Sequence, residues 1–187
     1  MGNRIPLIVA AIAVSVLAAN PMAAQSKPAP KGEIGLTYSF MRLGGRNAPA
    51  GVGIDASRAI TRSANDVEIL LVGDAGINRF GSTTDYDAAT QVQVMGGLRF
   101  AGRTSGGASP FAQVLAGVAS CCGETSPAVT VGVGVSAPVG KGATRLRVQA
   151  DFPTVFYGAG TTDGVTYASY RNTGIRVNAG IAIPLKR

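Results

Sequence analysis

Histidine and tryptophan are absent from the 187 residues, and the chain has only two cysteines. Without histidine, the Ser-His-Asp and Cys-His arrangements of nucleophilic catalysis are excluded, as are zinc sites that use histidine. Charged residues are also scarce, at 14% of the chain. After Ala24 no run approaches the roughly 20 apolar residues of a transmembrane helix. Any span of a membrane must therefore be built from strands.

The N-terminal segment has the pattern of a secretory signal peptide. Arg4 precedes an uncharged apolar run at 5–19, Asn20-Pro21 ends that run, and small residues suited to cleavage follow around Ala24. The run is short for a helical membrane anchor. We expect residues 1–24 to be the signal peptide, 25–32 to be a short polar lead-in and 33–187 to be one domain.

The composition favours strands and turns. The chain contains 26 glycines, and its 17 basic and 10 acidic residues give a net charge of +7. A basic balance can indicate nucleic-acid binding, but here the basic residues are scattered without a Lys/Arg block. We therefore expect no nucleic-acid partner.

Eight segments alternate between apolar and polar residues with a period of two, which is typical of strands. Each reaches the roughly 9–11 residues that cross a bilayer when tilted. They lie at 33–43, 50–60, 67–79, 89–101, 110–119, 127–139, 144–156 and 172–185. The sequence predicts an all-β fold, an eight-stranded antiparallel up-and-down transmembrane β-barrel. The longest connection, 158–171, is expected to be an outer loop, whereas 44–49 and 120–126 are short for outer loops.

The stretch RLRVQADF at 145–152 displays the alternation without a break, with polar residues on one face and apolar residues on the other. Sorting all eight segments in this way collects nearly balanced acids and arginines on the polar face. They are Glu33, Asp55, Glu68, Asp74, Arg99, Arg145, Arg147, Asp151 and Arg176. Because an unpaired charge is costly in a narrow lumen, this balance favours an inward-facing ion-pair network. In the alternative, a soluble lipocalin-like barrel, the apolar face would point inward.

Four segments carry a resemblance to a known family. They are PFAQVLAGVA (110–119), VTVGVGVSAPV (129–139), RLRVQADF (145–152) and RNTGIRVNAGIAIPL (171–185). With these segments the chain resembles the small eight-stranded outer-membrane β-barrels of Gram-negative bacteria, of the OmpA/OmpX type. The resemblance implies an outer-membrane location after export and insertion by the barrel-insertion machinery. It also implies contact with outer-membrane lipid and lipopolysaccharide, and a monomer.

Three local motifs were considered as chemical sites. GVGVSA (132–137) has dinucleotide-binding spacing, but it lies inside a strand, where small residues ease packing. Glu68 and Asp74 lie about 20 Å apart along a strand, too far for a catalytic carboxylate pair. Cys121-Cys122 is a candidate vicinal disulfide, with free thiols as the alternative. No metal site and no cofactor are predicted.

These observations predict a non-enzymatic barrel with a side-chain-filled polar lumen and a structural or surface-interaction role. Two alternatives remain open from the sequence. One is a narrow passive pore for small solutes, and the other is a secreted lipocalin-like binder of an apolar ligand.

Overall fold

The computed structural model describes residues 32–62, 67–82, 87–102, 107–140, 143–162 and 165–185. Eight strands form a closed antiparallel barrel, which confirms the predicted fold class. They are β1 Gly32–Leu43, β2 Arg46–Arg62, β3 Glu68–Phe80, β4 Ala89–Ala101, β5 Ser109–Cys121, β6 Glu124–Pro138, β7 Arg145–Tyr157 and β10 Tyr170–Pro184. The expected signal peptide and all of the lead-in except Gly32 lie outside the described residues. The described residues include no helix long and apolar enough to cross a membrane.

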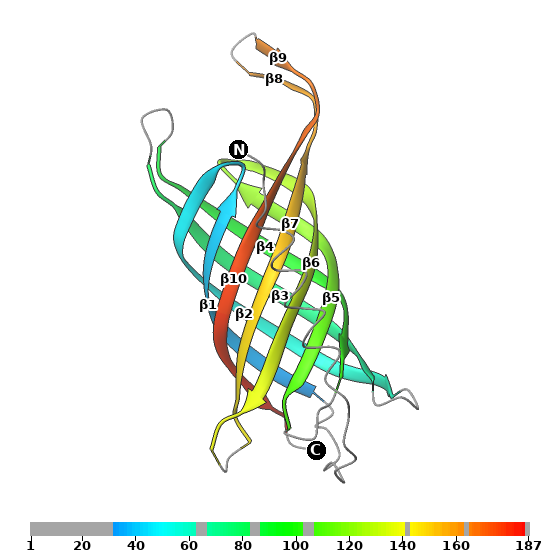
Figure 1. The fold of residues 1–187 in the computed structure, drawn as a ribbon. Helices are drawn as coiled ribbons and strands as arrows, with labels where there is room; N and C mark the ends of the chain where they lie inside the picture. Colours follow the sequence, from blue (N-terminus) through cyan, green and yellow to red (C-terminus); the bar gives the residue numbers. More distant parts are fainter. Residues whose placement is uncertain are drawn as a thin grey trace, which may run out of the picture.

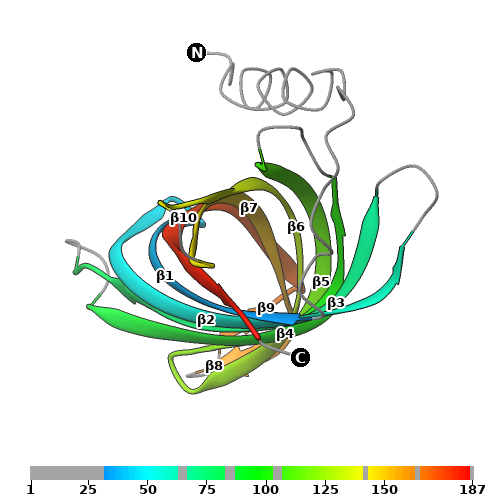
Figure 2. The same ribbon diagram turned by 90° about the horizontal axis from the view of Figure 1, so that it is seen from below.

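Consecutive strands pair around the barrel, and β10 closes it by pairing with both β7 and β1 (Figures 1 and 2). The closing register places Ile34 opposite Ile183 and Leu43 opposite Gly174. Closure leaves no strand edge with unpaired backbone groups, as a chain that crosses hydrocarbon requires.

The two ends of the barrel differ in their connections. We call the end that holds Gly32 and Pro184 the terminal rim, and the opposite end the hairpin rim. At the hairpin rim, tight turns at Gly44-Gly45 and Cys122-Gly123 have positive φ at both residues, as in type I′ turns. The strands therefore run further than expected, and the connections predicted at 44–49 and 120–126 shrink to two residues each.

The connection after β7 carries a small additional hairpin that the sequence did not predict. It consists of β8 (Gly160–Thr162) and β9 (Val165–Tyr167), which pair only with each other in the described part of the chain. Figure 1 shows this hairpin projecting beyond the hairpin rim. The region was predicted as an outer loop, and it is the longest extension from the barrel among the described residues.

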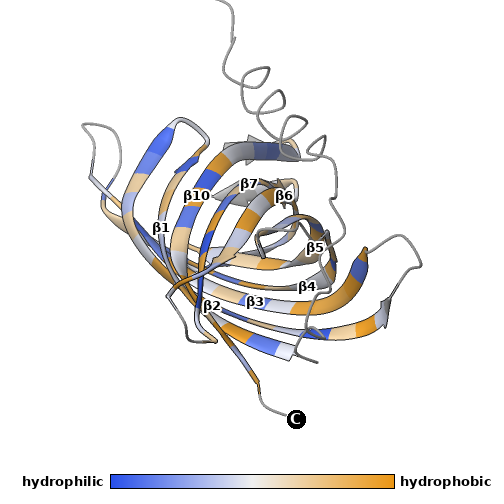
Figure 3. Ribbon diagram, turned by 60° about the horizontal axis from the view of Figure 1, so that its bottom comes forward, coloured by the Kyte–Doolittle hydropathy of each residue, from blue (hydrophilic) through white to orange (hydrophobic). Residues whose placement is uncertain are grey.

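The barrel has its apolar residues outside and its charged residues inside. Leu146 and Val148 are 48% and 42% exposed, whereas Arg147 and Asp151, on the other face of β7, are 1% and 0% exposed. The same alternation of hydropathy follows the other strands (Figure 3). A lipocalin-like barrel requires the reverse orientation, so that alternative is wrong. The outward valines, leucines and isoleucines form a surface suited to hydrocarbon.

The interior is not uniformly polar. Several large apolar side chains share the inward face with the charges and form a buried cluster, which includes Met41, Leu70, Val72, Met95, Phe111, Leu115 and Val155. Apolar and polar side chains are therefore interspersed within the lumen. On the outer face, exposure is not complete either, since Ile69 of β3 and Val133 and Val135 of β6 are only partly exposed.

Candidate functional site

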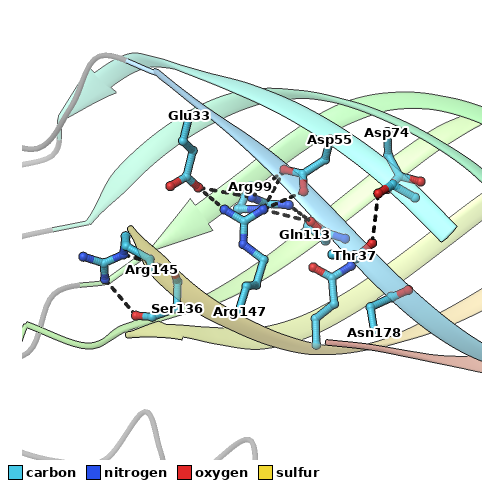
Figure 4. A network of polar contacts seen from close by, with 12 residues as sticks. Glu33, Thr37, Asp55, Asp74, Arg99, Gln113, Ser136, Arg145, Arg147 and Asn178 are labelled. Carbon is cyan, nitrogen blue, oxygen red and sulfur yellow. Dashed lines mark hydrogen bonds and ion pairs between the residues drawn. The ribbon is translucent and has the colours of Figure 1, made fainter. Parts of the chain in front are cut away.

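The lumen is crossed by a bonded network of charged side chains, with Arg147 near its centre (Figure 4). Arg147 Nη1 donates to both carboxylate oxygens of Asp55, at 2.6 and 2.7 Å. Its Nη2 donates to Glu33 Oε1. Both η nitrogens are thus bonded to carboxylates from β1 and β2, which lie two and three strands away from β7 around the barrel. The two ion pairs tie these strands together.

Arg99 of β4 extends the network. Its Nε and Nη2 donate to Gln113 Oε1 at 3.0 and 2.8 Å, and its Nη1 lies 3.4 Å from Asp55 Oδ2 and 3.6 Å from Glu33 Oε1. Its guanidinium stacks over the ring of Phe111, with Cζ 4.6 Å from the ring centroid. The ring supports the cation through its π face as well as by packing.

Asp151 is the most heavily bonded carboxylate of the network. Its Oδ1 accepts a hydrogen bond from Gln113 Nε2 at 3.0 Å. Its Oδ2 accepts bonds from Gln149 Nε2 at 2.9 Å, Asn178 Nδ2 at 2.7 Å, and Arg176 Nε and Nη2 at 3.1 and 2.8 Å. These donors compensate for removing the carboxylate from water, which would otherwise be costly.

The network ends at Asp74. Arg176 Nη2 lies 3.3 Å from Asp74 Oδ1, which also accepts a bond from Gln93 Nε2 at 3.1 Å. A continuous series of bonds therefore joins seven of the nine predicted residues: Glu33, Arg147, Asp55, Arg99, Asp151, Arg176 and Asp74, with Gln113 as the bridge between Arg99 and Asp151.

The remaining two predicted residues lie at the start of their strands, near the terminal rim. Arg145 donates to Ser136 Oγ at 3.0 Å, to the Ser136 carbonyl at 2.8 Å and to the Gly107 carbonyl at 2.8 Å. Glu68 is buried at the first position of β3. Arg145 therefore anchors β7 to β6 and to the connection between β4 and β5.

Strand β6 contributes space rather than charge. A Cβ built on Gly132 would meet Asp151 Oδ1 and, at 3.2 Å, Gln113 Cγ. A Cβ on Gly134 would meet Phe111 Cζ at 2.5 Å and Gln149 Cβ at 2.7 Å. The dinucleotide-like spacing of GVGVSA thus has a packing explanation, since its glycines leave room for the network.

Several members of the network were missing from the predicted site. They are Gln93, Phe111, Gln113, Gln149 and Asn178. All five lie on the inward face of their strands, so the alternation was a signal that could have found them. The predicted site contained only charged residues, and these five were left out because amides and aromatic rings carry no net charge.

The paired cysteines lie at the hairpin rim, away from the network. Both are free thiols, with their Sγ atoms 2.9 Å apart, beyond the roughly 2.05 Å of a disulfide bond. The candidate vicinal disulfide is therefore absent from the structure, in line with the strain expected when adjacent residues are bridged. Cys122 has φ 58°, so it occupies the left-handed region as the first residue of the turn.

The chemistry available to the lumen is that of paired charges. The network carboxylates accept bonds from guanidinium or amide groups, and Glu33 and Asp55 share Arg147, as Asp74 and Asp151 share Arg176. Within the described ranges, no group of three or more His, Cys, Asp or Glu residues is arranged to hold a metal ion. The arrangement is suited to joining strands and filling the lumen.

Comparisons with known proteins identify the fold. No family model matches the chain, and neither does any curated protein. Among solved structures, Neisserial surface protein A has a TM-score of 0.56 at 12% identity, covering 82% of this chain and 96% of its own. The outer membrane protein OprG from Pseudomonas aeruginosa has a TM-score of 0.51 at 9% identity, covering 86% of this chain and 98% of its own.

The outer membrane enzyme PagL is similar to the same extent, with a TM-score of 0.53 at 12% identity, covering 81% of this chain and 99% of its own. Together these similarities show that the chain has the fold of the small outer-membrane β-barrels, as the sequence resemblance implied. Because one of the three is an enzyme, the fold by itself does not define an activity.

Proposed function

We propose that this protein is an outer-membrane barrel with a closed lumen and a structural or surface-interaction role. The observation that carries the proposal is the burial of the network across the interior. Arg147, Gln113 and Asp151 are each at most 1% exposed, and apolar side chains such as Leu115 and Met41 fill the space beside them. A lumen filled in this way supports the barrel and blocks the passage of solutes.

The outer surface supports the membrane location. Apolar side chains are exposed on every barrel strand, from Ile34 on β1 to Ile183 on β10. Such a surface is poorly soluble in water and well matched to lipid. Fractionation of cells should recover the folded protein in the outer membrane, with a gel mobility that changes on heating. Folded protein in the soluble periplasmic fraction would contradict this location.

A non-enzymatic role is supported by the side chains present. The chain has no histidine, and the inward carboxylates Asp55 and Asp151 bond to guanidiniums. These bonds commit the two carboxylates to the lumen network, which leaves them poorly placed to act on a substrate.

Conductance measurements test the closed lumen directly. The purified protein in planar lipid bilayers is expected to give no discrete channel openings, because side chains occupy the interior. The double variant Arg99→Ala/Arg147→Ala removes two guanidiniums from the plug and should conduct ions. Val131→Ala, on the exposed outer face of β6, is the matched control and should remain closed. Regular openings of the unsubstituted protein would contradict the proposal and favour the narrow pore.

A further inference from the structure

The turn between β5 and β6 holds a cysteine in a backbone conformation that suits glycine. Among the described residues, Cys122 is the only one other than glycine with a positive φ, at 58°. The tight turn between β1 and β2, at the same rim, has glycine at both positions, Gly44 and Gly45. Left-handed backbone is unfavourable for cysteine, and residues strained in this way cluster at functional sites. The side chain of Cys122 is therefore a candidate for a chemical role.

The thiols of Cys121 and Cys122 are in direct contact. Their Sγ atoms lie 2.9 Å apart, inside the roughly 3.5–4.0 Å of an ordinary contact between carbon atoms. Cys121 ends β5, where its register partners are Gln91 of β4 and Glu124 of β6, so its backbone is held on both sides. Because a disulfide bond is about 2.05 Å long, bond formation needs the two sulfur atoms to approach by roughly 0.9 Å.

The two thiols differ in accessibility. Cys122 is exposed, whereas Cys121 is partly buried. Thiol–disulfide exchange starts at the thiol that a reagent can reach, because the rate depends on access to the attacking sulfur. Cys122 is therefore placed to react first with a dissolved reagent, and Cys121 is placed to attack the product from a sulfur 2.9 Å away.

A disulfide between these two residues is poorly suited to be a structural cross-link. Adjacent Cα atoms are about 3.8 Å apart, below the usual range of roughly 4.4–6.8 Å, so the bond is strained. It also encloses no intervening residue and adds little stability through loop closure. Strained and exposed disulfides are the labile, easily reduced ones. The geometry therefore favours a bond that forms and breaks in response to the surroundings.

We propose that Cys121 and Cys122 form a reversible dithiol–disulfide site that is oxidised by low-molecular-weight disulfides. In the first step, the Cys122 thiolate attacks one sulfur of the small disulfide, forms a mixed disulfide and releases one small thiol. In the second step, Cys121 loses its proton to water, attacks Cys122 Sγ and displaces the second small thiol. The protein gives up two electrons and two protons, and the small disulfide is reduced to two thiols.

This inference goes beyond the proposed structural role, and the proposed outer-membrane location supplies only its setting. Disulfides form and persist outside the cytoplasm, where thiols are not kept reduced. Exchange on the purified barrel tests the site by itself, whereas cell fractionation tests the location. Failure of one can therefore be distinguished from failure of the other.

The test treats the reduced, folded barrel in mild detergent with oxidised glutathione as the probe. Mass spectrometry follows the tryptic peptide 104–141, which contains both cysteines. The peptide from the unsubstituted protein is expected to lose two hydrogen atoms and to retain no glutathione. Millimolar reduced glutathione should then restore both thiols, because a strained disulfide is easily reduced.

Two single variants separate the roles of the thiols. Cys121→Ser keeps the exposed thiol and should accumulate the mixed disulfide with glutathione, because no second thiol is present to displace it. Cys122→Ser keeps the partly buried thiol and should react about tenfold more slowly than Cys121→Ser. Heat-modifiable gel mobility checks that each variant is a folded barrel.

An unsubstituted protein that stays unreacted or keeps a bound glutathione would overturn the proposal, as would disulfide-linked dimers on a non-reducing gel. Equal reaction rates of the two single variants would contradict the assignment of Cys122 as the thiol that reacts first. An oxidised pair that survives millimolar reduced glutathione would show a structural disulfide in place of a reversible site.

Discussion

Arg147 and Asp55 meet in the centre of the lumen although 92 positions separate them in the sequence, with Arg147 Nη1 2.6 and 2.7 Å from the two carboxylate oxygens. The pair joins β7 to β2, strands that are not neighbours in the barrel wall. It therefore adds a cross-link that backbone hydrogen bonds between adjacent strands do not supply.

Arg147→Ala should destabilise the barrel strongly. The substitution leaves the buried carboxylates of Asp55 and Glu33 without their main cationic partner, at a cost of about 3–5 kcal/mol. Urea unfolding of the protein in lipid vesicles measures this difference. Arg58→Ala, at an exposed outward position, should change stability by no more than about 0.5 kcal/mol. Equal effects of the two substitutions would show that the lumen network contributes little.

Val148→Arg should disfavour the folded state in the membrane. Val148 faces outward on β7 between exposed Leu146 and Phe152, and a charge in hydrocarbon costs about 2–4 kcal/mol near the bilayer midplane. Val148→Leu keeps the apolar surface and should be within about 0.5 kcal/mol of the original. The free energy of unfolding in vesicles separates the two variants. A tolerated arginine at this position would argue that β7 does not contact lipid with this face.

Gly132→Ala should disturb the network without removing any of its members. The added methyl group meets Asp151 Oδ1 and Gln113 Cγ, and such overpacking typically costs about 1–3 kcal/mol. Gly73→Ala is the matched control, because a Cβ on Gly73 has no atom within 4 Å. The midpoint of thermal unfolding should fall for the first variant only. Identical midpoints would mean that Asp151 can move aside freely.

Cys122→Asn should stabilise the hairpin between β5 and β6. Cys122 adopts φ 58°, a left-handed conformation that costs a cysteine about 1–2 kcal/mol and that asparagine tolerates better. We expect a gain of up to about 1 kcal/mol in unfolding stability. Cys121→Ser, at the preceding extended position, provides the comparison and should give no such gain. A loss of stability in Cys122→Asn would indicate that the contact between the two thiols stabilises the hairpin by more than the backbone strain at Cys122 destabilises it.

The alternation in the sequence was sufficient to predict which side chains face inward, because a strand reverses its side chains at every residue. Contacts between two strands of one hairpin were also predictable from the sequence. Arg99 and Gln113 are register partners on β4 and β5, so the turn between those strands fixes their meeting. The pairing of Arg147 with Asp55 was not predictable, since it depends on how the strands are staggered around the closed barrel. The β8–β9 hairpin was missed because its strands are only three residues long.

The pairing of β1 with β10, which closes the barrel, limits how early in folding the wall can form. Ile34, near the start of β1, pairs with Ile183, near the end of β10, so the wall cannot close until almost the whole chain is available. Pairings of such large sequence separation form slowly, and until then both terminal strands carry open edges. Between synthesis and insertion, the chain therefore depends on being shielded from self-association, and loss of either terminal strand should expose the polypeptide to aggregation and proteolysis.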